Sequence, residues 1–254
     1  MRLREFVLLS ALLPPTLCTV KAMPETRTND ELRSPAISET ASGGTNRESA
    51  TTSLPMPPSQ LMIKDKALSS AYYDTLSILL DGNKCSDFFG GSAGAVEVFN
   101  KLMENIVTDH VRESVGMRMF GHSTNVLNTQ TKMRYRLFEK VAINSNGPFY
   151  RQKMGPASPN IPRMGTFRPN SREVRVLMFL HELGHLMKGR DGNWLLSDDG
   201  HDDALSSSNS GQIETVCGNQ IRETTRSEPG SELIKKRRSE GLLAAHGVKS
   251  ATQN

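Results

Sequence analysis

The strongest pattern of apolar positions lies between residues 170 and 190. Apolar residues there occupy more than one side of a predicted helix, namely Val174, Val176, Leu177, Met178, Phe179, Leu180, Leu183, Leu186 and Met187. Asn170 or Ser171 is suited to cap the start of this helix, and Lys188-Gly189-Arg190 is suited to end it. A surface helix has only one apolar stripe, so the pattern predicts a helix buried in a core.

Weaker patterns surround this helix and indicate a mixed domain. Apolar spacing predicts helices over 67–80 and 95–106. Between 116 and 150, β-favouring residues alternate with charged ones, which predicts strands that end at the Asn144-Ser145-Asn146-Gly147 turn. Roughly residues 61–224 form one domain's worth of chain. We therefore expect a single domain of the α+β class, with a small sheet and flanking helices.

The N-terminal end differs from this domain in composition. Arg2 and Arg4 precede an apolar run that is too short to span a bilayer, and a small residue, Ala22, follows it. This layout predicts a signal peptide over 1–22, and therefore an exported protein, periplasmic or extracellular, without a transmembrane helix. Residues 23–60 are rich in Ser, Thr and Pro and poor in large apolar residues, which predicts a disordered linker.

The C-terminal end, 225–254, is expected to be a basic flexible tail. It carries Lys235-Lys236-Arg237-Arg238 and much of the net charge of +4. Such a run is either a solvated end or a weak contact with anionic surfaces such as phospholipid or wall polymer. Because no aromatic residues are interleaved with it and no nucleic-acid motif is present, we expect no nucleic-acid partner.

The three cysteines fit export. Cys18 belongs to the predicted signal peptide, which leaves Cys85 and Cys217 as an even pair. Two cysteines far apart in sequence are more often bonded than free in an oxidising compartment, so we expect a disulfide between them. The alternative, thiolate metal ligands, lacks the close spacing of zinc–thiolate sites.

The chemistry of the chain is concentrated in His181-Glu182-Leu183-Gly184-His185, inside the predicted core helix. Residues four apart lie on the same face of a helix, so both imidazoles can bind one metal ion. The Glu182 carboxylate, one position further on, can meet a water molecule instead of the metal. Two histidine ligands and one general base are the arrangement of zinc peptidases, so the pentapeptide predicts a catalytic Zn²⁺ site with Glu182 as base.

A catalytic zinc site commonly has three protein ligands, and the third is expected after the helix. The run from Ser197 to Asp203 holds four aspartates and a histidine, and both oxygen and imidazole ligands suit zinc. Asp199 is the first candidate, followed by His201, Asp191 and Glu214. The opposing interpretation is that the run is a solvated acidic turn that caps the next helix.

The helix, the pentapeptide and residues 195–217, LLSDDGHDDALSSSNSGQIETVC, resemble a small family of exported bacterial zincin-like proteins of an acidobacterial type. The matching positions are Asp199-Gly200, Leu205-Ser206, Asn209 and Cys217, together with the clusters 85–91 and 143–149. The resemblance covers roughly residues 65–222. It implies a metallopeptidase with a small sheet over the metal-binding helix, and the preference for Asp199 rests partly on it. It also implies that residues 141–144 form an edge strand along the substrate cleft.

These patterns together predict an exported zinc-dependent hydrolase, most simply a peptidase acting on a peptide or protein substrate. The competing interpretation is a catalytically silent zincin-fold binding module in which the metal or the disulfide is structural. It is motivated by Lys188, which stands where the metzincin pattern needs a glycine. For the reaction's oxyanion, Tyr135 or Tyr150 is an expected donor, and nothing in the sequence chooses between them.

Overall fold

The computed structural model describes residues 58–59, 64–110, 116–129, 131–153, 155, 160–231, 233 and 235. All of them lie within one compact unit, Ser49–Asn254. The predicted signal peptide, nearly all of the predicted linker and the last part of the predicted tail lie outside the described residues.

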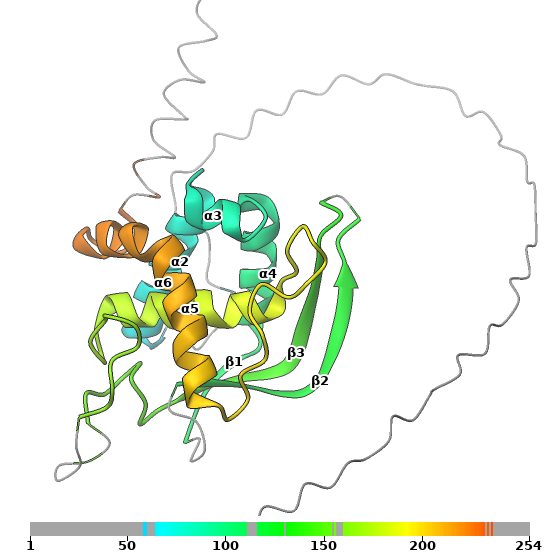
Figure 1. Ribbon diagram of the computed structural model, residues 1–254. Coiled ribbons are helices and arrows are strands. Elements are labelled where there is room, and N and C mark those ends of the chain that lie inside the picture. Colours follow the sequence, from blue (N-terminus) through cyan, green and yellow to red (C-terminus); the bar gives the residue numbers. More distant parts are fainter. Residues whose placement is uncertain are drawn as a thin grey trace, which may run out of the picture. The chain divides into compact units, whose positions relative to one another are not determined.

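The described residues form five helices and three strands. In chain order these are α2 (Lys66–Leu80), α3 (Lys84–Phe88), α4 (Ser92–Glu104), β1 (Ile106–Asp109), β2 (Met117–Leu127), β3 (Arg134–Asn144), α5 (Arg172–Leu186) and α6 (Asp203–Arg226). The small sheet and its flanking helices agree with the α+β class expected from the sequence. Figure 1 shows the sheet at one side of the helices, with α5 and α6 crossing each other.

The sheet has the order β1-β3-β2, with β1 parallel and β2 antiparallel to β3. Residues 141–144 pair with β1 on one side and with the start of β2 on the other, so the expectation that they form an edge strand is wrong. The cause lies in Ile106-Val107-Thr108. These β-branched residues favour a strand, so α4 ends at Glu104 and β1 occupies the edge where a substrate had been expected.

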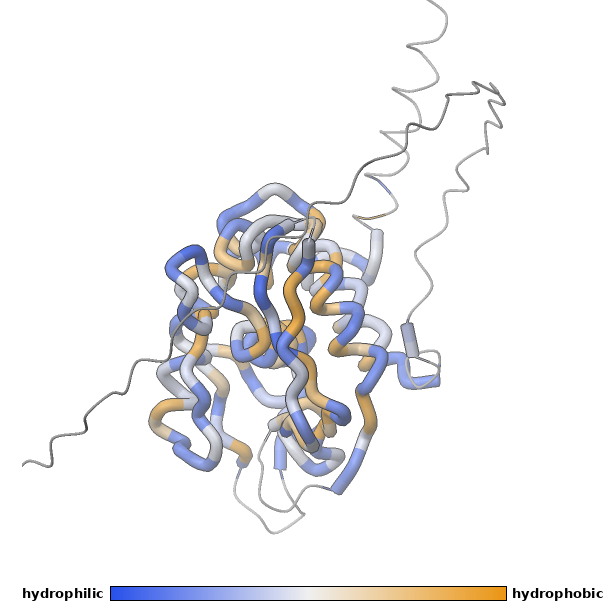
Figure 2. The backbone as a smooth tube through the Cα atoms, turned by 90° about the vertical axis from the view of Figure 1, so that its right-hand side faces the viewer, coloured by the Kyte–Doolittle hydropathy of each residue, from blue (hydrophilic) through white to orange (hydrophobic). Residues whose placement is uncertain are grey.

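Helix α5 lies at the centre of the unit, in contact with α2, α4, α6 and β3. Its residues from Val176 to Leu186 are all buried, as the apolar pattern predicts. Strand β2, in contrast, is partly or fully exposed at every residue after the first. Figure 2 views the molecule from the side of the sheet and shows hydrophilic stretches interspersed with hydrophobic ones.

Polar side chains cap the helices that carry the site. Ser171 Oγ accepts a hydrogen bond from Val174 N at the start of α5. At the start of α6, Asp202 Oδ1 accepts hydrogen bonds from the backbone N–H groups of Ala204 and Leu205. The helix-capping interpretation of the acidic run is therefore confirmed for Asp202.

A disulfide joins Cys85 in α3 to Cys217 in α6, which confirms the predicted pairing. It links segments 132 residues apart in the sequence. None of the helices in the described part of the chain is long and apolar enough to cross a membrane. At the C-terminal end, α6 continues to Arg226 and Leu233 is buried, so the ordered structure reaches past the expected domain end at 224.

Candidate metal centre

Helix α5 supplies three ionisable groups from one buried turn. His181, Glu182 and His185 are 4%, 9% and 3% exposed. The two imidazoles lie on the same face of the helix, and their Nε2 atoms are 3.0 Å apart. Helical spacing accounts for this convergence, because residues four apart stack one above the other.

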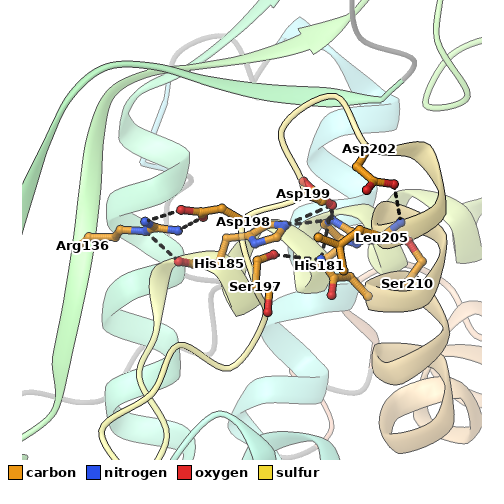
Figure 3. A network of polar contacts seen from close by, with 10 residues as sticks. Arg136, His181, His185, Ser197, Asp198, Asp199, Asp202, Leu205 and Ser210 are labelled. Atoms are coloured by element: carbon orange, nitrogen blue, oxygen red, sulfur yellow. Dashed lines mark hydrogen bonds and ion pairs between the residues drawn. The ribbon is translucent and has the colours of Figure 1, made fainter. Parts of the chain in front are cut away.

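Asp199 completes the group from the loop between α5 and α6. Its Oδ2 lies 3.1 Å from Nε2 of His181 and 3.4 Å from Nε2 of His185. These three residues are the group of possible metal-binding side chains found among the described residues. Figure 3 shows Asp199 reaching over the helix toward both imidazoles.

The separations between the three donor atoms test whether zinc fits. Ligand atoms about 2.0–2.1 Å from a tetrahedral zinc ion lie about 3.3 Å from one another. The separations observed for the two nitrogens and the oxygen are 3.0, 3.1 and 3.4 Å. Two imidazoles and one carboxylate are also a donor set that zinc accepts. The residues therefore fit a zinc ion in both chemistry and spacing.

Arg136, from β3, holds the loop that carries Asp199. Its Nε donates to the backbone carbonyl of His185 at 2.9 Å, at the end of α5. Its two terminal nitrogens donate to the carboxylate of Asp198, one of them at 3.1 Å. The guanidinium also lies over the ring of Trp194, 4.4 Å from the centroid. One buried arginine thus ties the second histidine to the residue next to Asp199, as the dashed lines of Figure 3 show.

The same loop packs closely against α5 at Gly184. Leu196 N donates to the Gly184 carbonyl at 3.2 Å. A Cβ at position 184 would lie 2.6 Å from Leu196 Cδ1, so only glycine leaves the loop its present path. The glycine of the pentapeptide therefore allows the close approach that brings Asp199 to the histidines.

Two polar residues of α6 support the group from the other side. Ser210 Oγ lies 3.0 Å from Nδ1 of His181, and a metal-binding histidine usually has such a partner on its second nitrogen. Asn209 Nδ2 donates to the Ser197 carbonyl at 2.9 Å and contacts Asp199 Oδ2 at 3.4 Å. Nδ1 of His185, in contrast, is buried without a hydrogen-bond partner among the described residues.

Charges inside the group shift its acid–base behaviour. Burial alone would raise the pKa of Asp199, but hydrogen bonds from His181 and His185 outweigh it and hold that pKa well below its usual range. For His185, burial would lower the pKa, whereas the hydrogen bond to Asp199 and the charge of Glu182 raise it. Burial also raises the pKa of Glu182, against the opposing effect of the two histidines. A raised carboxylate pKa is typical of a general base that works near neutral pH.

The other third-ligand candidates lie elsewhere. Glu214 accepts hydrogen bonds from Thr166 N at 2.8 Å and from Arg222 at 2.7 Å. Asp191 accepts from the backbone N–H of Asn193 at 3.1 Å in an exposed loop. His201 is exposed in the turn before α6. Of the four candidates, the structure brings only Asp199 to the two histidines, and its assignment as a ligand stays a prediction.

The hydroxyl groups of both tyrosines expected as hydrogen-bond donors to the oxyanion have other partners in the structure. The Tyr150 hydroxyl donates to Asp65 Oδ2 at 2.6 Å, and the Tyr135 hydroxyl donates to Glu97 Oε1 at 3.1 Å. Burial and the hydrogen bond to Glu97 raise the pKa of Tyr135 to about 12. Both phenols therefore contact groups outside the candidate metal centre, and an oxyanion-donor role for either of them stays a prediction.

The sequence analysis assigned no role to the supporting residues, although Asn209 is among the positions that carry the family resemblance. Asn209 and Ser210 lie one turn before Ile213, on the face of α6 that also carries Cys217. Polar residues on a buried face indicate that they have polar partners there, so the sequence did contain a signal for these two residues. Arg136 gave no such signal, because it stands in a strand with three other charged residues. Its role depends on a partner 62 residues away in the sequence.

Comparison with protein-family models, with curated proteins and with solved structures finds no match to this chain. The assignment of a function therefore rests on the residues of the site and their geometry.

Proposed function

We propose that this chain is an exported, zinc-dependent hydrolase of the zincin kind, most simply a peptidase. The observation that carries the proposal is the convergence of His181, His185 and Asp199, with donor atoms 3.0–3.4 Å apart, beside the buried carboxylate of Glu182. A metal ion would justify the burial of so many ionisable groups.

His181, His185 and Asp199 would hold the ion. Bound zinc supplies Lewis-acid chemistry, since it acidifies water and polarises a carbonyl. Glu182 follows His181 directly and has no hydrogen-bond partner among the described residues, so its carboxylate is free to accept a proton. Its raised pKa lets it take the proton from water and later return it to the leaving amine.

The surrounding fold supports the proposal in outline. A small sheet stands beside the helix that carries both histidines, and α5 contacts β3 directly. Tyr135 forms a β-bridge with Met187, and Lys188 N donates to the Arg134 carbonyl at 3.1 Å, so the segment that follows α5 pairs with the start of β3. A peptide that binds by strand addition would therefore use β1 or β2.

Two observations favour the second candidate, a binding module with a structural metal. The three donor residues are buried or nearly so, and structural zinc sites are closed whereas catalytic sites keep an open position. Two surface hollows, of about 730 and 530 Å³, lie in the described part of the chain, and none of the three donors lines either of them.

Substitution of Glu182 separates the two candidates. In the hydrolase, Glu182→Gln keeps zinc affinity within about threefold, but hydrolysis of an unstructured protein such as casein falls by at least about a hundredfold. Glu173→Gln, in the first turn of the same helix, is the matched control and keeps full activity. Wild-type turnover by Glu182→Gln would contradict the mechanism. Absence of hydrolysis in the zinc-loaded wild type, across a library of peptide substrates, would favour the binding module.

Cobalt substitution gives a readout that does not depend on the substrate. The visible spectrum of bound Co²⁺ responds to added azide only if the site has an open position. A response supports a catalytic site, and an unchanged spectrum supports a structural one.

A further inference from the structure

A concave surface with an excess of positive charge lies beside the loop that follows α5. This hollow has a volume of about 530 Å³, within the range of small-molecule sites. Three separate segments form it: the end of α3 with the following turn, the connection between β2 and β3, and the loop after α5. We refer to it below as the basic hollow.

Its charged lining is unbalanced. Lys132, Arg134, Lys188 and Arg190 are cationic, and Asp87 is the one carboxylate among the lining residues. Nowhere in the described ranges does a carboxylate form an ion pair with any of these four cations. Lys188 Nζ instead lies over the Trp194 ring, 4.8 Å from its centroid. Like charges brought together repel each other, so a bound anion would stabilise this arrangement.

The wall of the basic hollow is apolar. Phe88, Met133 and Leu195 belong to its lining, and all three pack against the hydrophobic core. A site with an apolar wall and convergent charged groups is suited to a ligand that has both an anionic group and a hydrocarbon part. Arginine guanidinium groups bind carboxylate and phosphate oxygens in pairs, which favours an oxyanion over a halide.

We propose that the basic hollow binds a small molecule that carries a carboxylate or phosphate group on an apolar skeleton. None of its lining residues is a donor of the candidate metal centre, so this site is independent of the proposed hydrolase activity. The two sites share one element. Leu195 lines the hollow and donates from its N–H to the Met187 carbonyl at 2.9 Å, four residues before Asp199.

Trp194 provides the reporter, because it is the one tryptophan of the chain and lies beside Lys188. The full chain in metal-free buffer is titrated with inorganic phosphate, phenyl phosphate and benzoate, and fluorescence is followed together with calorimetry. We expect saturable binding of one molecule per chain. Phenyl phosphate should bind about tenfold more tightly than inorganic phosphate, because its ring buries apolar area. Comparison of phenyl phosphate with benzoate shows which oxyanion the cations prefer.

Substitutions locate the binding. The double variant Arg134→Gln/Arg190→Gln should weaken phenyl phosphate binding by at least about tenfold, since charge-assisted hydrogen bonds are lost. The matched control Lys66→Gln/Lys101→Gln removes two cations outside the hollow and should keep the affinity within about twofold. Lys188→Gln is a second test if the double variant loses its fold. His185→Ala should bind normally, which separates this site from the metal centre.

Two results would overturn the proposal. One is the absence of saturable binding of all three probes by calorimetry. The other is an equal loss of affinity in the double variant and in its control, which would show a general effect of net charge.

Discussion

Substitution of Arg136 by glutamine tests whether this residue positions the candidate metal centre. The wild-type side chain donates one hydrogen bond to the His185 carbonyl and two to Asp198, and it lies over Trp194. Glutamine is shorter and neutral, so it keeps at most one of these contacts. We expect the loop that carries Asp199 to lose its fixed position.

The magnitude follows from the separate contacts. A hydrogen bond from a charged donor to the buried His185 carbonyl contributes about 1.5–3 kcal/mol. The Asp198 side chain is 68% exposed, so its pair with Arg136 adds only about 0.5 kcal/mol after solvent screening. Contact with the Trp194 ring adds about 1 kcal/mol. The free energy of unfolding should fall by about 3–4.5 kcal/mol in total, and zinc affinity should fall by about 10- to 100-fold, as is usual when an outer partner of a ligand is removed.

The assay combines urea unfolding of the metal-free chain with zinc titration against a competing chelator. Lys140→Gln is the matched control, because it removes one cation from the same strand, where Lys140 Nζ pairs with Asp109 at 3.1 Å. The control should keep both values near wild type. A drop in unfolding free energy with unchanged zinc affinity would refute the positioning role and leave Arg136 as a purely structural residue.

Three further predictions concern the fold around the site. Gly184→Ala should lower the free energy of unfolding by about 1 kcal/mol and also lower zinc affinity, because overlap of the new Cβ with Leu196 outweighs the gain in helix propensity. Gly211→Ala, in α6 with open space around it, should instead raise the free energy of unfolding by up to about 1 kcal/mol in the same urea titration. Replacing Cys85 and Cys217 by serine opens a loop of 132 residues and should lower the free energy of unfolding by up to about 5 kcal/mol. An equal urea midpoint for the oxidised wild type and this variant would contradict a stabilising role of the disulfide. At Asp109, the hydrogen bond from Lys140, followed by the one from a backbone N–H, lowers the pKa of the carboxyl group. The stabilisation from these contacts is therefore present at neutral pH and is lost as the pH falls through this lowered pKa. An NMR titration of the carboxyl carbon should show a midpoint below the usual value, and an ordinary midpoint would exclude the effect.

Local patterns in the sequence were sufficient to predict the buried helix that carries the two histidines of the candidate metal centre. The apolar periodicity around His181 and His185 reports burial, and helical spacing fixes which side chains share a face. The disulfide between Cys85 and Cys217 also followed from composition and compartment. Both inferences depend on properties of single segments or of residue counts, which the sequence states directly.

Contacts between segments that are far apart in the sequence could not be predicted in the same way. The family resemblance implies an edge position for residues 141–144, and nothing in their own sequence shows that β1 pairs with them. Asp199 stood among four candidates, and its proximity to the histidines depends on the Arg136 hydrogen bonds and on Leu196 packing against Gly184. These contacts join segments far apart in the sequence, so no periodicity or spacing reports them.

Zinc content and affinity of the purified full-length chain test the central claim most directly. Wild type, His185→Ala and Asp199→Asn are compared, with Asp191→Asn as the matched control, since that carboxylate lies in an exposed loop outside the group. We predict one zinc ion per chain in wild type and control, and an affinity reduced by at least about a hundredfold in the two ligand variants. No stoichiometric zinc in the wild type, or zinc retained at wild-type affinity by both ligand variants, would contradict this prediction.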